Sequence, residues 1–183
     1  YAYFSSYSDS WVEHARRYVE AMIAREQLGA KSLVMEIASN DGYLLQHFHA
    51  AHIPVLGIDP AANVAAVAIA KGIPTEVAFF GTETARALAA RGYMADLMAA
   101  NNVLAHVPDL NGFVAGVATL LQPSGVAIFE VPYLKDMLDN VEFDTIYHEH
   151  QCYYSLTALQ RLFATHDLDI VDVERIPIHG GSI

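Results

Sequence analysis

The sequence is poor in cysteine and in positive charge, and each shortage excludes a class of protein. Its single cysteine, Cys152, rules out an internal disulfide framework and a cysteine-based zinc site within the chain. Lys and Arg number 10 against 21 Asp and Glu, so the clustered positive charge of a nucleic-acid-binding surface is missing. We therefore expect no nucleic-acid partner, although a few local cations could still hold a small phosphorylated substrate.

Long apolar segments are absent as well. No apolar run reaches the roughly 18 residues that a membrane span needs, and residues 1–30 lack the basic-then-apolar order of a signal peptide. The chain is 54% hydrophobic and 17% charged over 183 residues, which is typical of one compact globular domain. These features favour a cytoplasmic protein without membrane contact.

What the sequence does contain is a regular alternation of short apolar strands and helices. A first helix is expected from a capping box at Ser10 to about Leu28, with Gly29 as its C-cap. Strands are then expected at 32–37, 55–58, 74–79, 95–100, 125–131 and 168–175, and helices at 43–50, 61–71, 82–91, 110–121 and 155–165. This order predicts an α/β fold with a parallel sheet covered on both faces. Residues 132–154 are left as a long irregular loop, which in a compact domain is usually functional.

The turn after the first strand is the first place to look for a ligand site, because α/β sheets bind ligands at the carboxyl ends of their strands. The glycine pattern of a dinucleotide-binding fold is absent there. Instead Glu36 ends the strand, and Ala38, Asn40 and Gly42 lie in the small-residue turn that follows. This turn resembles the first motif of class I methyltransferases. An ordinary tight turn with Gly42 at a positive φ is the alternative.

The second and third strands end in further candidates. Asp59, followed by Pro60, is placed to accept the hydroxyls of a ribose, although an N-cap for the next helix would explain it equally simply. Phe79 and Phe80 could stack on an adenine ring or could be two core aromatics. Both alternatives stay open from the sequence.

The fourth strand ends in Asn101 and Asn102, with His106 a few residues later. Two successive amide side chains are costly to bury at a strand end without partners. The carboxylate or amino group of a ligand would satisfy them. The arrangement is again the one that methyltransferases show after this strand.

A second group of polar residues lies in the long loop, from Tyr147 through His148 and Glu149 to His150. The two histidines are two positions apart, whereas a helical zinc motif needs a spacing of four, so we expect no metal here. The group suits acid–base chemistry, in which a histidine removes a proton and a neighbouring glutamate orients it. A solvated polar loop is the alternative.

Five segments together resemble the deoxysugar C-methyltransferases, a family of class I enzymes that depend on S-adenosylmethionine. They are Y-A-Y-F-S-S at 1–6, E-I-A-S-N-D-G at 36–42, A-N-N-V-L-A-H at 100–106, Y-H-E-H at 147–150 and H-G-G-S at 179–182. The similarity spans essentially the whole chain. The Y-x-E-H and H-G-G-S segments are far more specific than the motif after the first strand.

The resemblance implies a Rossmann-like three-layer sandwich with a central, mostly parallel sheet. Residues 1–30 would be an N-terminal segment with a capping helix, and residues 31–183 the S-adenosylmethionine-binding core. Family members have a cysteine-rich zinc-binding segment before this region and a second α/β domain after it that helps hold the nucleotide-sugar. The family sheet also has a seventh, antiparallel strand between the fifth and sixth, which would be largely missing here. We therefore expect the chain to be an excerpt of a longer protein.

The resemblance also implies a reaction, in which a carbon next to a keto group of a dTDP-linked deoxysugar is methylated. Such a carbon becomes nucleophilic only after a proton leaves and an enolate forms. By resemblance, His150 is the base, Glu149 and Tyr147 support it, and His106 with Tyr1 or Tyr3 binds or polarises the sugar.

The cofactor residues implied are Glu36, Ala38, Asn40, Gly42, Asp59, Pro60, Phe80, Asn101 and Asn102. An O- or N-methyltransferase of small molecules and a non-catalytic S-adenosylmethionine-binding domain are the competing interpretations. The absent glycine pattern makes an NAD-dependent oxidoreductase the least favoured.

Overall fold

The computed structural model describes residues 4–177 and 180–183, and these form a parallel sheet of five strands in the order β3-β2-β1-β4-β5. The strands are β1 (Val34–Ile37), β2 (Val55–Ile58), β3 (Thr75–Glu76), β4 (Ala95–Asn101) and β5 (Leu121–Glu130). The strand order reverses between β1 and β4, so the carboxyl ends of these two strands flank the crevice in which such folds bind ligands.

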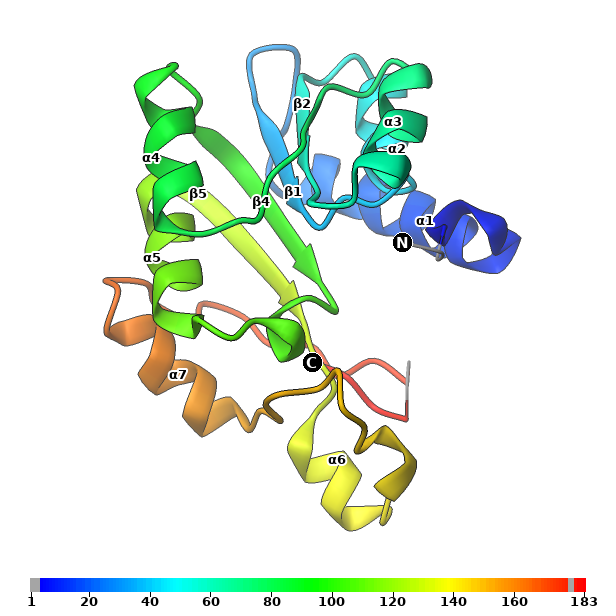
Figure 1. The fold of residues 1–183 in the computed structure, drawn as a ribbon, viewed down its shortest axis with the longest axis vertical. Coiled ribbons are helices and arrows are strands. Elements are labelled where there is room, and N and C mark those ends of the chain that lie inside the picture. The colour runs from blue at the N-terminus through cyan, green and yellow to red at the C-terminus, as the bar shows by residue number, and fades with distance from the viewer. Residues whose placement is uncertain (1–3, 178–179) are drawn as a thin grey trace.

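Helices cover both faces of the sheet, which confirms the predicted α/β sandwich (Figure 1). On one face lie α1 (Asp9–Arg25), α2 (Leu45–Ala50) and α3 (Ala62–Ala70), and on the other α4 (Thr82–Ala90), α5 (Leu110–Leu120) and α7 (Leu156–Ala164). Successive strand residues point to opposite faces. Thus Val34 packs in the core of the α1 side, and Met35 in the core of the α4 side.

The first helix begins and ends earlier than the sequence predicts. Ser8, not Ser10, is its N-cap, and the Ser8 side chain accepts a hydrogen bond from the Trp11 amide at 3.4 Å. Ser8 has the extended backbone that a cap needs, whereas Ser10 already lies within the helix. At the other end, Gln27 has the positive φ, +52°, that was expected at Gly29.

Two strand predictions are also wrong. The predicted third strand at 74–79 pairs with β2 only over Thr75–Glu76, because the chain leaves this edge of the sheet directly afterwards. The predicted sixth strand at 168–175 is not a strand: it is mostly exposed and joins no neighbour in the described sheet. Its pattern of apolar residues is real, since Leu168 and Ile170 pack against the core, but a strand needs a partner.

The end of the chain lies antiparallel to the tip of β5. Val131 and Ile183 exchange both backbone hydrogen bonds, at 2.9 and 3.0 Å. Ser182 and Ile176 do the same on the other side, again at 2.9 and 3.0 Å. Residues 182–183 therefore lie between Val131 and Ile176, where the family resemblance puts an antiparallel strand.

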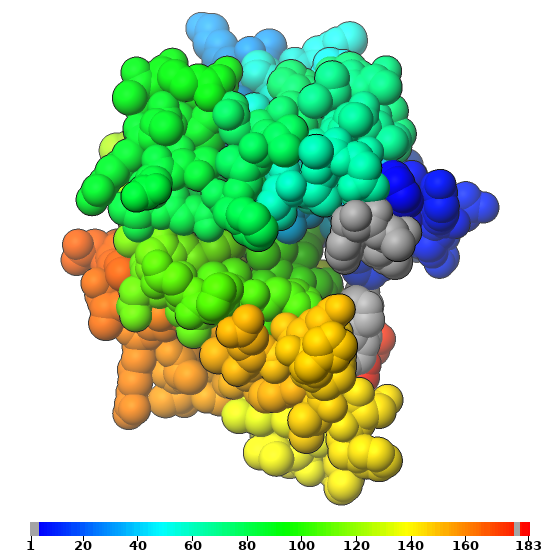
Figure 2. All heavy atoms as spheres, viewed as in Figure 1, coloured from blue at the N-terminus to red at the C-terminus, as the bar shows by residue number. Residues whose placement is uncertain are grey.

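The segment predicted as one long loop, 132–154, contains a helix, α6 (Leu134–Asp139), and a single 3-10 turn at Phe143–Thr145. In Figure 2 this part of the chain, yellow to gold, forms a lobe at one end of the molecule. The buried Asp136 carboxylate accepts a hydrogen bond from Arg175, which ties α6 to the segment after α7. Among the described residues, no helix is long and apolar enough to cross a membrane.

Candidate active site

The turn after β1 is built on alternate residues with left-handed backbone. Ala38, Asn40 and Gly42 have φ values of +55°, +52° and +78°. A Cβ atom at Gly42 would also lie 3.2 Å from Ile73 Cγ1, a tight contact, and the positive φ strains any other residue here. Two strained non-glycine residues in one turn are more than an ordinary tight turn requires, and such strain concentrates at functional sites.

The N-terminal segment is fastened directly to this turn. The Asn40 side-chain oxygen accepts hydrogen bonds from the amides of Ser5, at 3.0 Å, and Asp41, at 2.9 Å. Ser6 donates to the Asp41 carboxylate, and Lys71 donates to the Asp41 carbonyl at 3.0 Å. Sequence reasoning missed these contacts, because a Ser-Ser pair carries no signal of its partner.

Tyr1 and Tyr3, the candidate sugar-binding tyrosines, lie outside the described residues. Ser5 and Ser6, which follow them closely in the chain, contact the turn after β1. The sugar-binding role of Tyr1 or Tyr3 stays a prediction.

Asp59 lies buried at the end of β2, beside this turn. One carboxylate oxygen accepts from the Asn40 amide at 2.9 Å and the other from the Ala61 amide at 2.8 Å. Ala61, not Asp59, is the N-cap of α3, so the simple capping alternative does not account for this residue. Each oxygen keeps further acceptor capacity, which ribose hydroxyls could use. Pro60 follows and is exposed.

The two phenylalanines after β3 behave differently. Phe80 is partly buried and meets the edge of Phe113 on α5, with ring centroids 5.2 Å apart and planes at 74°. Phe79 is 83% exposed. The core alternative therefore holds for Phe80, and its contact with an adenine ring stays a prediction.

Glu36 is fully buried at the end of β1, with 1% of its surface exposed. Burial raises the pKa of this carboxyl well above its usual value, and the nearby charges of Asp59 and Asp41 raise it further. A hydrogen bond from the Tyr43 side chain opposes these effects. One oxygen, Oε2, has no hydrogen-bond partner among the described residues, and neither does Oδ1 of Asn101 at the end of β4.

Asn102 is hydrogen bonded to the end of the neighbouring strand, β5. Its side-chain amide donates to Glu130 Oε1 at 2.7 Å, and its backbone amide donates to the Glu130 carbonyl at 2.8 Å. Glu130, buried at the end of β5, was missed by sequence reasoning. The available signal was the same as for Glu36, an acidic residue that ends an apolar strand.

The loop histidine His150 is held by two hydrogen bonds. Its Nδ1 atom lies 3.0 Å from the Thr145 carbonyl oxygen, and its Nε2 atom lies 3.0 Å from the Tyr147 hydroxyl. A carbonyl can only accept, so in the neutral ring Nδ1 carries the hydrogen and Nε2 is the basic nitrogen. The tautomer is thus fixed by the backbone, with the Tyr147 ring packed at 4.2 Å between centroids.

The structure brings His106 and His150 together, with ring centroids 5.0 Å apart. His106 Nδ1 lies 3.0 Å from the Glu149 carbonyl oxygen, which fixes the same tautomer. The Gln151 amide donates to the Ala105 carbonyl at 2.8 Å, so the loop is docked across the turn that follows β4. The loop and the turn after β4 therefore lie against each other.

The Glu149 carboxylate lies beside the other histidine of this loop. It lies 3.9 Å from His148 Nε2, and both side chains are largely exposed. The Thr145 carbonyl and Tyr147 hydroxyl take the orienting positions at His150 that a neighbouring glutamate was expected to take. In the part of the chain that the structure describes, no group of three or more His, Cys, Asp or Glu residues is arranged to hold a metal ion.

Comparison with known proteins identifies the family of this chain. A model of the methyltransferase domain family matches residues 11–173, and the chain belongs to that family. It is 42% identical over 183 residues to the C-methyltransferase NovU of Streptomyces niveus. The match covers 100% of this chain and 44% of NovU, so the chain spans less than half the length of that relative.

Several solved structures share the fold. Magnesium protoporphyrin IX methyltransferase from Synechocystis, solved with bound SAH, superposes with a TM-score of 0.68 over 93% of this chain and 80% of its own, at 14% identity. YcgJ from Bacillus subtilis gives 0.66 over 90% and 72%, at 17% identity. DesVI from Streptomyces venezuelae gives 0.53 over 67% and 51%, at 16% identity.

Proposed function

We propose that this chain is the cofactor-binding and base-carrying part of an S-adenosylmethionine-dependent C-methyltransferase. Membership of the methyltransferase family and the 42% identity to NovU support the reaction class. The observation that carries the proposal further is the tautomer of the His150 ring. The Thr145 carbonyl accepts from Nδ1 and so leaves Nε2 as the basic nitrogen, and the ring lies beside His106.

S-adenosylmethionine would lie across the carboxyl ends of β1, β2 and β4, where it supplies a transferable methyl group on a sulfonium. The residues there fit such a ligand, because the turn of Ala38, Asn40 and Gly42 brings backbone close and Glu36 and Asn101 have unpartnered buried oxygens. Asp59 and Pro60 would hold the ribose. Asn102 would hold the end of β4 in place through its hydrogen bond to Glu130, and Phe80 would border the adenine.

The substrate would be a keto sugar carried on a nucleoside diphosphate, by analogy with the deoxysugar family. His150 Nε2 would accept the proton from the carbon next to the keto group, which generates the enolate. His106 in its protonated form, or the Tyr147 hydroxyl, could donate a hydrogen bond to the developing oxyanion. Methyl transfer then depends on alignment of the enolate carbon with the sulfonium.

Calorimetry on the full-length protein tests the cofactor. S-adenosylhomocysteine should bind and NADH should not. The proposal fails if NADH binds tightly while S-adenosylhomocysteine gives no heat.

Turnover by the full-length enzyme tests the base. We expect His150→Ala to lower kcat by about 10²–10⁴, the usual contribution of a general base, with cofactor affinity unchanged. His148→Ala is the matched control, since that side chain is 89% exposed. A near wild-type rate in His150→Ala would mean that His150 is structural and that the base lies elsewhere.

A further inference from the structure

The end of the chain lies against the lobe of residues 132–154. Gly180 and Gly181, in the H-G-G-S segment, have positive φ values of +84° and +140°. The Tyr133 amide donates a hydrogen bond to the Gly181 carbonyl at 2.9 Å. His179, in the same segment, lies outside the described residues. The proposed function gives this segment no role so far.

Both glycines face carboxylates of the lobe. A Cβ atom at Gly181 would lie 2.5 Å from Asp136 Oδ2 and 2.8 Å from Asp136 Cβ. A Cβ atom at Gly180 would meet the Glu142 carboxylate in the same way. Real Cβ atoms essentially never come within 3.0 Å of such a non-neighbouring heavy atom, so a side chain at either position requires its neighbour to move.

Asp136 has little freedom to move. It is buried in the first turn of α6, and its carboxylate forms an ion pair with Arg175. The Arg175 guanidinium in turn lies over the Tyr133 ring, 5.7 Å from its centroid. Glu142 is less constrained, since its side chain is longer and only half-buried. Gly181 is therefore the position at which a side chain would push α6 away.

Displacement of α6 would reach the base, because the lobe is fixed on two sides. On the side of β4, the Gln151 amide donates to the Ala105 carbonyl at 2.8 Å. On the side of β5, Tyr133 donates to Gly181. His150 lies between these contacts along the chain, so its place depends on both. A shift of a catalytic group by about 1 Å can lower a rate by roughly 100-fold.

We propose that Gly181 and the Asp136–Arg175 ion pair are positioning residues for the base His150. Gly181 allows α6 to approach the end of the chain, and the ion pair holds α6 there. They act only through the place of His150 relative to the substrate carbon. The inference rests on the proposed function, because it takes His150 as the base.

Solvent exchange of the proton next to the keto group tests this role, because it measures the base without methyl transfer. The full-length protein is mixed with S-adenosylhomocysteine and a dTDP-linked keto deoxysugar in deuterium oxide, and NMR follows the exchange. Gly181→Ala should lower both the exchange rate and kcat by about 10- to 100-fold. Affinity for S-adenosylhomocysteine should stay unchanged.

Gly92→Ala is the matched control. Gly92 has a φ of +87°, and nothing lies within 4 Å of its Cβ position, so this variant shares the backbone strain without the clash. It should lower Tm while exchange and kcat keep their wild-type values.

Arg175→Ala tests the same role without a clash, and it decides the question alone if Gly181→Ala does not fold. Loss of the ion pair should lower the exchange rate by about 3- to 10-fold. Arg91→Ala is its control, because Arg91 also pairs with a carboxylate, Glu76, at 2.8 Å and lies 5.1 Å from the Tyr93 centroid. That variant should leave the exchange rate unchanged.

Wild-type exchange in the folded Gly181→Ala or in Arg175→Ala, or an equal loss of S-adenosylhomocysteine affinity, would overturn the positioning role and leave the proposed function intact. Exchange in His150→Ala as fast as in the wild type would instead overturn the proposed base, and this inference with it.

Discussion

Single acidic residues at the strand ends lie where the surrounding fold disfavours their charged form. Glu36 is the clearest case, because its pKa lies well above the ordinary value of 4.5 through burial and the charges of Asp59 and Asp41. The folded state therefore holds this proton more tightly than the unfolded chain does. The contribution of Glu36 to the free energy of unfolding is therefore fully present below about pH 4.5, and it is lost as the pH rises through the pKa of the folded state.

We predict that Glu36→Gln stabilises the ligand-free protein at alkaline pH and weakens binding of S-adenosylhomocysteine. The amide keeps the shape of the side chain without its charge. Thermal unfolding over a pH series measures the effect: the Tm values of wild type and variant should converge toward pH 4.5 and diverge above it. A constant offset between the two at all pH values would contradict the assignment.

The hydrogen bond between Tyr147 and His150 is the second case at the residue scale. Tyr147→Phe removes the hydroxyl that lies 3.0 Å from His150 Nε2, while the Thr145 carbonyl still fixes the tautomer. We expect kcat of the full-length enzyme to fall by about 3- to 10-fold, the usual value of one neutral hydrogen bond. A fall as large as that in His150→Ala would mean that the phenol itself transfers the proton.

At the scale of elements, the first helix shows how a cap is selected. Both Ser8 and Ser10 satisfy the sequence rule for a cap, and the backbone chooses Ser8, whose φ of −101° and ψ of 106° are extended. The choice depends on the preceding turn at Ser5–Tyr7, which is anchored to Asn40. That anchor joins residues 35 positions apart, so no local pattern contains it.

We predict that Ser8→Ala lowers the free energy of unfolding by about 1 kcal/mol, the usual cost of losing an N-cap. Ser10→Ala, at an exposed helix position, should change it by less than about 0.5 kcal/mol. Chemical denaturation of the two variants measures both values. The reverse order would restore Ser10 as the cap.

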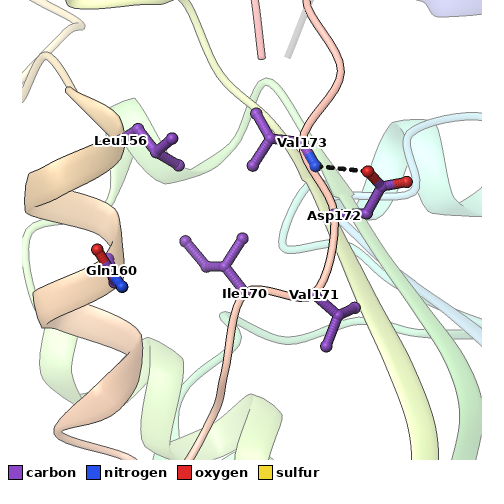
Figure 3. Close-up of a pocket in the computed structure, with 6 residues that line it drawn as sticks. All are labelled: Leu156, Gln160, Ile170, Val171, Asp172 and Val173. Carbon is purple, nitrogen blue, oxygen red and sulfur yellow. Dashed lines mark hydrogen bonds between the residues drawn. The ribbon is translucent and has the colours of Figure 1, made fainter.

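At the scale of the whole molecule, the outer side of β5 is an open edge of the sheet within the described residues. From Leu121 to Glu130, β5 pairs with β4 on one side, and within the described residues no second strand pairs with the other. Figure 3 shows the neighbouring groove, where Leu156 of α7, Ile170 and Val173 point toward one another and Val171 points away. The groove contains none of the predicted site residues.

We predict fast amide exchange at 169–175 in the 183-residue chain and slow exchange in β1. Among the described residues, no backbone acceptor serves the amides from Asp169 to Arg175, whereas β1 is paired on both sides. Hydrogen exchange followed by mass spectrometry measures the difference. The open edge of β5 should also make this chain prone to association. A monomeric chain with slow exchange at 169–175 would contradict both expectations.

The layers of the fold and the order of its strand-end site could be predicted from the sequence alone. Apolar periodicity and chain order suffice for a βαβ alternation, and an α/β sheet always brings its strand ends to one edge, so Glu36, Asp59 and Asn101 had to lie near one another. Contacts in the folded chain were needed to show which of these atoms stay unpartnered, which serine caps α1, and that 168–175 is not a strand. They also show that Thr145 and Tyr147, rather than the Glu149 carboxylate, hold His150. These outcomes depend on contacts between segments far apart in the chain, and a local pattern records which groups need partners but not which partners they find.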